Sequence, residues 1–228
     1  MRVAFIVPAY NEASTILEVL KRLDDLELEK QVVIVDDGST DDTPAIVDQW
    51  GEGRNDVSIV HQANRGKGAA IRAAIAYVDA EIVVIQDADM EYDPADVPAL
   101  IEPIRSGVAD VVYGSRLTGG KPQRAYLFWH LVGNRFLSLL TGVLYNTTLS
   151  DMETGYKAFR AEVLKSLKLR EDSFAIEPEI TAKVCKRHLR VYELPIAYYG
   201  RTYAEGKKIT WRDGVRAIWV LLRVRVAD

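Results

Sequence analysis

The first half of the chain alternates between short apolar runs and longer amphipathic segments. The apolar runs are almost wholly hydrophobic, as is typical of strands buried on both faces of a parallel sheet. The segments between them repeat apolar residues at helical spacing. The predicted strands span residues 2–10, 31–39, 57–62, 81–89 and 108–116, and the predicted helices 13–26, 41–50, 64–78 and 95–107. This alternation predicts an α/β fold with a mostly parallel central sheet flanked by helices.

A polar cluster follows each predicted strand. The clusters read PAYNE (8–12), DDGS (36–39), NRGKG (64–68), DAD (87–89) and GSR (114–116). One such cluster would mean little, because proline, asparagine and aspartate are ordinary turn residues. The carboxyl ends of parallel strands share one edge of the sheet, however, and ligands bind there. The repeated pattern therefore predicts a cleft lined by these clusters.

Two further apolar segments carry polar residues. Residues 125–145 hold His130, Asn134 and Arg135 near their middle, which would be costly in hydrocarbon, so we expect one or two amphipathic helices there rather than a membrane span. The C-terminal segment 209–228 mixes tryptophan and leucine with several arginines. It suits either a helix at a membrane interface or a terminal helix docked on the core. We place a catalytic domain at 1–210 and this amphipathic helix at 211–228.

Composition narrows the function classes. The chain has 228 residues, 48% of them hydrophobic, which is enough for one large α/β domain. A net charge of −4 argues against a general nucleic-acid binder. The single cysteine, Cys185, excludes an internal disulfide and fits a reducing compartment. No signal peptide is expected at the N-terminus.

The DAD cluster offers the clearest chemistry. Asp87 and Asp89 lie two positions apart, so in extended backbone both carboxylates point the same way. Such a pair can bind Mg²⁺ or Mn²⁺ together with phosphate oxygens, with Glu91 either completing the site or facing water. Lys67 and the backbone of NRGKG could meet a diphosphate. The spacing matches neither a P-loop nor the dinucleotide fingerprint, which argues against an NTPase and a dehydrogenase.

Taken in order with DMETGYKAF (151–159), these motifs resemble family 2 glycosyltransferases of the GT-A fold. Within that family the chain is most similar to the polyprenyl-phosphate glycosyltransferases typified by dolichol-phosphate mannose synthase. The resemblance covers Arg2 to about Arg223. It implies an inverting, metal-dependent enzyme that moves a hexose from a GDP- or UDP-sugar to a polyprenyl (dolichyl or undecaprenyl) phosphate.

The resemblance also implies roles for individual residues. The nucleotide sugar would be bound by Pro8, Tyr10, Glu12, Asp37, Lys67 and Asp87, and the metal by Asp87, Asp89 and Glu91. The catalytic residues would be Asp89, Arg116, Asp151 and Arg201, and the acceptor phosphate would be held by Arg116, Arg201, Lys207 and Lys208. Glu91 stands where mannose synthases often have glutamine, and Glu153 receives no role.

A lipid phosphate is already an oxyanion near neutral pH, so it needs cations to approach a diphosphate rather than a base. Two alternatives stay open. A same-fold glycosyltransferase could act on a lipid-linked sugar or a small alcohol, with Asp151 as base, or the chain could bind sugar nucleotides without catalysis. The expected location is cytoplasmic and peripheral on the inner membrane face. The expected partners are the membrane surface and a separate membrane-embedded protein, with no nucleic acid.

Overall fold

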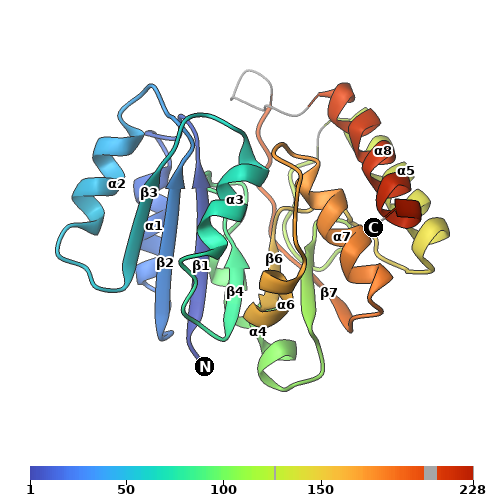
Figure 1. Ribbon diagram of the computed structural model, residues 1–228, viewed down its shortest axis with the longest axis horizontal. Helices are drawn as coiled ribbons and strands as arrows, with labels where there is room; N and C mark the ends of the chain where they lie inside the picture. The colour runs from blue at the N-terminus through green and yellow to red at the C-terminus, as the bar shows by residue number, and fades with distance from the viewer. Residues whose placement is uncertain (126, 203–209, 228) are drawn as a thin grey trace.

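A seven-stranded sheet, in the order β3-β2-β1-β4-β6-β5-β7, forms the centre of the protein (Figure 1). This computed structural model describes residues 1–125, 127–202 and 210–227. In the described sheet, β6 runs antiparallel to both of its neighbours, and the other pairings are parallel. The strands are β1 (Val3–Ala9), β2 (Lys30–Asp36), β3 (Val57–His61), β4 (Ile82–Ile85), β5 (Val111–Ser115), β6 (Lys157–Arg160) and β7 (Val191–Pro195). The expected α/β fold with a mostly parallel sheet is confirmed.

The five strands predicted from apolar runs are all present, with their carboxyl ends on one edge. The prediction extended some of them too far, since β4 ends at Ile85 and leaves the DAD cluster beyond the strand. Strands β6 and β7 lay outside the prediction. Strand β6 has four residues that begin with lysine and end with arginine, so no apolar run marks it.

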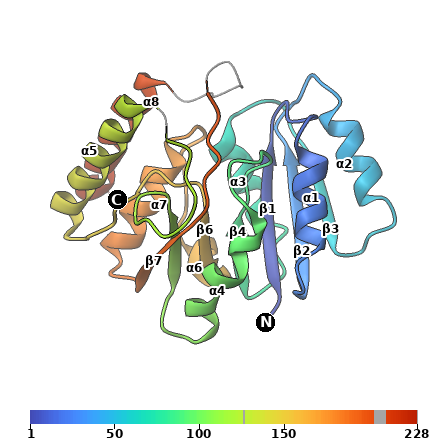
Figure 2. The same cartoon turned by 180° about the vertical axis from the view of Figure 1, so that it is seen from behind.

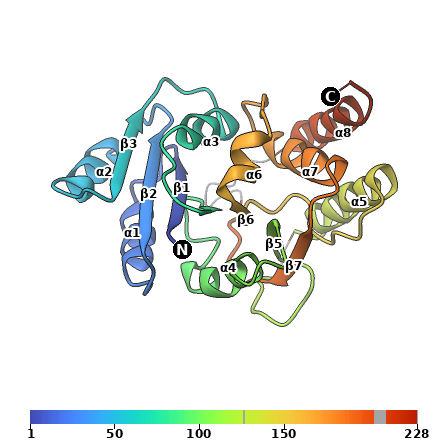
Figure 3. The same cartoon turned by 60° about the horizontal axis from the view of Figure 1, so that its bottom comes forward.

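Helices cover both faces of the sheet because successive strand residues point to opposite sides. Val3, Phe5 and Val7 of β1 pack toward α1, α2 and α4, whereas Ala4 and Ile6 pack toward α3, α6 and α7. Figures 2 and 3 show these two helical layers. One layer holds α1 (Ile16–Asp24), α2 (Thr43–Gly51), the 3₁₀ turn η1 (Pro94–Asp96) and α4 (Val97–Arg105); the other holds α3 (Lys67–Ile75), α6 (Ala161–Ser166) and α7 (Ile176–Lys186).

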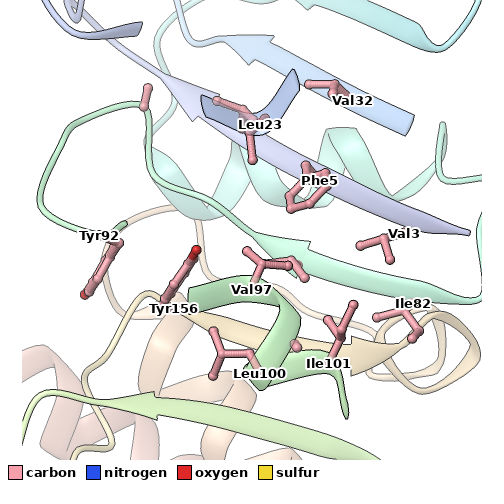
Figure 4. Packing of buried hydrophobic residues seen from close by; sticks show 14 of the residues in the cluster. Val3, Phe5, Leu23, Val32, Ile82, Tyr92, Val97, Leu100, Ile101 and Tyr156 are labelled. Atoms are coloured by element: carbon pink, nitrogen blue, oxygen red, sulfur yellow. The ribbon is translucent and has the colours of Figure 1, made fainter. Parts of the chain in front are cut away.

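The hydrophobic cluster on the α1 and α4 side of the sheet extends to the loops that follow the carboxyl ends of the parallel strands (Figure 4). Phe5 is fully buried among residues of α1 and α4, and truncation of such a core phenylalanine costs about 3–5 kcal/mol. At the far end of this cluster, the rings of Tyr92 and Tyr156 stack with centroids 5.0 Å apart. The Tyr92 hydroxyl accepts a hydrogen bond from the Gly155 amide at 3.1 Å. The core therefore holds the loop before β6 in place.

A third cluster joins α5 (Phe128–Tyr145) and α8 (Trp211–Ala227) to α7. Of the apolar segment 125–145, residues 128–145 form one long helix, and the C-terminal helix docks through Ala217, Val220 and Leu221. Glu171 accepts hydrogen bonds from Arg216 and Arg223, so two of the C-terminal arginines fasten α8 to the body of the protein.

Both helices also leave an apolar face exposed to solvent. On α5 this face holds Phe128, Trp129, Val132, Phe136, Leu139 and Val143, and on α8 it holds Trp211, Val215, Trp219, Leu222 and Val226. Trp129 and Trp211 are 78% and 75% exposed. Among the helices of the described chain, none is both long enough and apolar enough to cross a bilayer.

Candidate functional site

A cleft of about 440 Å³ lies at the carboxyl ends of the parallel strands. It brings together most of the residues that the sequence singled out, from segments far apart in the chain. The predicted residues that line it are Pro8, Tyr10, Glu12, Asp37, Lys67, Asp87, Asp89, Glu91, Arg116 and Arg201. Asp151 does not line it, and Lys207 and Lys208 lie outside the described residues. The polar strand endings therefore form the cleft that their pattern predicts.

Asp37 shapes one wall of the cleft. One of its carboxylate oxygens accepts from the Gln62 amide at 2.6 Å and the Arg65 backbone at 2.9 Å, and the other accepts from the Gly66 backbone at 2.7 Å. The adjacent Gly38 has a φ of +72°, and a Cβ there would come within 2.6 Å of the Asn64 nitrogen. Only glycine lets the DDGS and NRGKG loops approach this closely.

Lys67 lies on the cleft floor between two acids. Its ammonium is 2.6 Å from Asp87 Oδ1 and 3.3 Å from Glu177 Oε1. Burial opposes the charge on Lys67, but the two carboxylates raise its pKa above the ordinary value. A Cβ on Gly155 would meet both the Asp87 carboxylate and the Lys67 ammonium at 2.8 Å. This ion pair therefore needs a glycine beside it.

Arg201 lines the same cleft and bridges three acids. Its guanidinium donates to Glu12 at 3.1 Å and 3.3 Å, makes a short contact with Asp89, and lies 3.6 Å from Glu91. The Arg201 backbone nitrogen also donates to Glu91 at 2.6 Å. Burial opposes the guanidinium charge, but the surrounding carboxylates raise its pKa. Arg201 thus neutralises the acids at the end of β4.

The carboxylates after β4 have the chemistry of a divalent-cation site. Burial raises the pKa of Asp89 to about 7, and the charges of Asp87 and Glu91 act in the same direction. Oxygen ligands under mutual repulsion suit Mg²⁺ or Mn²⁺. Nowhere in residues 1–125, 127–202 and 210–227, however, do three such ligands converge as a metal ion requires. In this structure Lys67 pairs with Asp87, and Arg201 pairs with Asp89 and Glu91.

Asp151 sits behind Arg116 rather than in the cleft. Its carboxylate is fully buried and accepts from the Arg116 backbone at 2.9 Å and from the Arg116 side chain at 2.7 Å through both oxygens. Asn134 of α5 donates a further hydrogen bond at 2.7 Å. The Arg116 guanidinium also lies 5.1 Å from the centre of the Tyr198 ring. Asp151 therefore positions Arg116 at the cleft and does not face the cleft itself.

Sequence reasoning missed several residues of the cleft. Tyr92, three positions after Asp89, could have been found by extending the DAD cluster to QDADMEYDP (86–94). Glu177 had no such signal, because it lies in the otherwise unremarkable start of α7. Phe174 also lines the cleft, from a loop that no pattern marked, and Tyr198 lines it from the segment that leads to Arg201. Glu153, which the sequence left without a role, lines it as well.

Comparisons with known proteins agree with this geometry. The family profile described as Glycosyl transferase family 2 matches residues 4–168. The undecaprenyl-phosphate mannosyltransferase of Micrococcus luteus is 30% identical over 250 residues, covering 99% of each chain. The glycosyltransferase AglJ of Haloferax volcanii is 32% identical over 200 residues, which span 87% of this chain and 63% of AglJ. Among solved structures, glucosyl-3-phosphoglycerate synthase of Mycobacterium tuberculosis superposes with a TM-score of 0.76 at 20% identity, covering 100% of this chain and 79% of that one.

Proposed function

The chain belongs to glycosyltransferase family 2, and on this premise we propose that it transfers a hexose from a nucleoside-diphosphate sugar to a polyprenyl phosphate. One observation carries the proposal: two arginines, Arg116 and Arg201, line the same cleft as the acids after β4. Opposite charges arranged in this way suit a reaction between two phosphate-bearing substrates. The name of the Micrococcus luteus relative points to the same class of acceptor.

The surroundings of Asp151 favour a phosphate acceptor over an alcohol that would use Asp151 as its base. An alcohol needs a carboxylate or imidazole within reach to take its proton, whereas a phosphate oxygen attacks without one. Asp151 is the residue expected for that role, but both of its carboxylate oxygens accept hydrogen bonds from Arg116 or Asn134. We therefore assign Asp151 to positioning Arg116, and Arg116 to binding the acceptor phosphate.

Of the remaining cleft residues, some would bind the sugar-nucleotide donor and others the acceptor phosphate. Pro8, Tyr10 and the loops held by Asp37 form the wall for the nucleoside. Lys67 balances the charge of Asp87, which lies where the diphosphate would bind. Arg201 draws the acceptor phosphate toward the anomeric carbon, and in-line attack with departure of the nucleoside diphosphate inverts that carbon. A Mg²⁺ or Mn²⁺ ion held by Asp87, Asp89 and Glu91 would stabilise the negative charge of the leaving diphosphate.

The exposed apolar faces of α5 and α8 suit a peripheral position on the membrane. A lipid acceptor is confined to the bilayer, so its transferase must work at that surface. Trp129, Trp211 and Trp219 stand out from these faces, and tryptophan favours the headgroup region. Arg135 on α5 and Arg225 on α8 are also exposed and would attract anionic lipid.

The test is a transfer assay on the purified protein. It combines GDP-mannose, UDP-glucose or UDP-N-acetylglucosamine with Mg²⁺ or Mn²⁺ and a short polyprenyl phosphate, and glycolipid is detected by mass spectrometry. We expect one donor to give a hexosyl polyprenyl phosphate. Asp89→Ala should transfer the hexose at least about a hundredfold more slowly than wild type, because the leaving diphosphate loses the metal ion that would stabilise its charge. Its circular dichroism spectrum should match that of wild type.

A matched set of acceptors decides between acceptor classes. A polyprenol of the same chain length lacks the phosphate but keeps the lipid, and a short-chain alkyl phosphate keeps the phosphate alone. Transfer to the polyprenyl phosphate and none to the polyprenol supports the proposal. Equal transfer to the polyprenol would refute the phosphate acceptor, and no turnover of any donor would refute catalysis of hexose transfer.

A further inference from the structure

Glu153 is a cleft residue that no motif explained. It lies in the loop before β6 and lines the cleft beside Tyr92, Gly155 and Phe174. Its Oε1 atom is buried and has no hydrogen-bond partner among the residues that the structure describes. Buried carboxylate oxygens are normally satisfied, so an unsatisfied one in a binding cleft calls for a donor from outside the protein.

The two cationic side chains near Glu153 are paired with other carboxylates. Lys157 is fully buried and donates to Glu177 at 2.5 Å. Arg116 is held by Asp151 through both guanidinium contacts. Burial raises the pKa of Glu153 to about 7, with the charges of Glu177 and Asp151 acting in the same direction against Lys157 and Arg116. Near neutral pH the carboxyl group can therefore both accept and donate a hydrogen bond.

The position of Glu153 along the sheet suggests what supplies the partner. A nucleoside-diphosphate hexose is linear, running from base and ribose through diphosphate to sugar. The nucleoside wall stands at the ends of β1 and β2, and Asp87 follows β4, the next strand along. Glu153 precedes β6, the strand beyond β4. A donor that follows this order places its hexose beside Glu153.

We propose that Glu153 hydrogen-bonds a hydroxyl group of the transferred hexose and so determines which hexose the enzyme accepts. This inference rests on the proposed function, because it takes the donor to be a nucleoside-diphosphate sugar. A carboxyl group that meets a sugar hydroxyl in a buried site discriminates strongly against sugars that lack it, since its own oxygen is then left unpaired.

The test measures binding, so that it does not depend on the acceptor. Calorimetry with Mn²⁺ compares UDP with UDP-glucose and UDP-N-acetylglucosamine, and GDP with GDP-mannose. For the sugar nucleotide that binds most tightly, the ratio of its affinity to that of the matching nucleoside diphosphate measures how much the sugar contributes to binding. The variants are Glu153→Ala and the isosteric Glu153→Gln, and Glu162→Gln on the exposed side of α6 serves as a matched control.

We expect Glu153→Ala to lower affinity for the sugar nucleotide about tenfold to a hundredfold while affinity for the nucleoside diphosphate stays within about twofold. Glu153→Gln should retain part of the sugar contribution, and Glu162→Gln all of it. A donor with the recognised hydroxyl replaced by hydrogen should bind wild type and Glu153→Ala alike.

Equal weakening of nucleotide and sugar nucleotide by Glu153→Ala would overturn the inference, as would an unchanged sugar contribution. The inference also fails if no sugar nucleotide binds wild type more tightly than its nucleoside diphosphate. If only the proposed acceptor is wrong, the result differs. Wild type still binds the sugar nucleotide more tightly than the nucleoside diphosphate, and Glu153→Ala still loses this difference, but no glycolipid forms from the polyprenyl phosphate.

Discussion

Replacing Asp151 with asparagine separates a positioning role from a catalytic base. The carboxylate accepts four hydrogen bonds, three from Arg116 and one from Asn134. Asparagine keeps one oxygen but turns an amide donor toward donors of Arg116, and it leaves the guanidinium without a counter-charge. Asp151 is fully buried and the Arg116 side chain is only 15% exposed, so breaking the pair should lower the free energy of unfolding by about 3–5 kcal/mol.

The pH dependence of this loss has a definite sign. Burial acts to raise the pKa of Asp151, but its contacts with Arg116 outweigh that effect and lower the pKa below 3.8. A group whose pKa is lower in the folded state stabilises the protein above its unfolded value. The difference between wild type and Asp151→Asn should therefore be complete at pH 7 and shrink as the pH falls below about 3.8.

Urea unfolding of wild type, Asp151→Asn, Arg116→Met and the double variant measures the pairing directly. We expect a coupling free energy of about 2 kcal/mol or more between the two sites. In steady-state assays Asp151→Asn should raise the KM for the lipid phosphate through displacement of Arg116. Unfolding within about 0.5 kcal/mol of wild type, with a kcat reduced a thousandfold or more, would instead identify Asp151 as the base.

Three further outcomes can be measured on the same protein. Arg201→Ala should bind Mn²⁺ several-fold more tightly in calorimetry without nucleotide, because the guanidinium no longer competes for Asp89; unchanged or weaker binding would place the metal elsewhere. Trp219→Ser should reduce co-sedimentation with anionic vesicles about fivefold or more, and salt should weaken wild-type binding, whereas equal sedimentation of both proteins would exclude α8 from the contact. Glu153→Gln should raise the melting temperature relative to wild type at pH 8 but not at pH 5, because the raised pKa of Glu153 makes its burial increasingly unfavourable as the pH rises from 4.5 through 7; equal shifts at both pH values would contradict that pKa.

Sequence alone was sufficient for the part of the cleft that the ends of β1, β2 and β4 form. Apolar runs such as AFIV and VVIV can be buried only as strands covered on both faces, and the helical spacing between them supplies the cover. Parallel strands then carry their polar endings to one edge, whatever the details of packing. The position of PAYNE, DDGS and DAD around one cleft followed from these local patterns.

The charge partners in the cleft were decided by tertiary structure. Arg201 meets Glu12 from 189 positions away, and Lys67 meets Glu177 of a helix that carries no motif. Asp151 turned toward Arg116, 35 positions away, because the antiparallel strand β6 brings the preceding loop behind the end of β5. Periodicity encodes which residues are buried, but an ion pair depends on where separate segments converge in space. The pairing of Arg201 with Asp89 and the unpaired Glu153 are therefore properties of the folded chain.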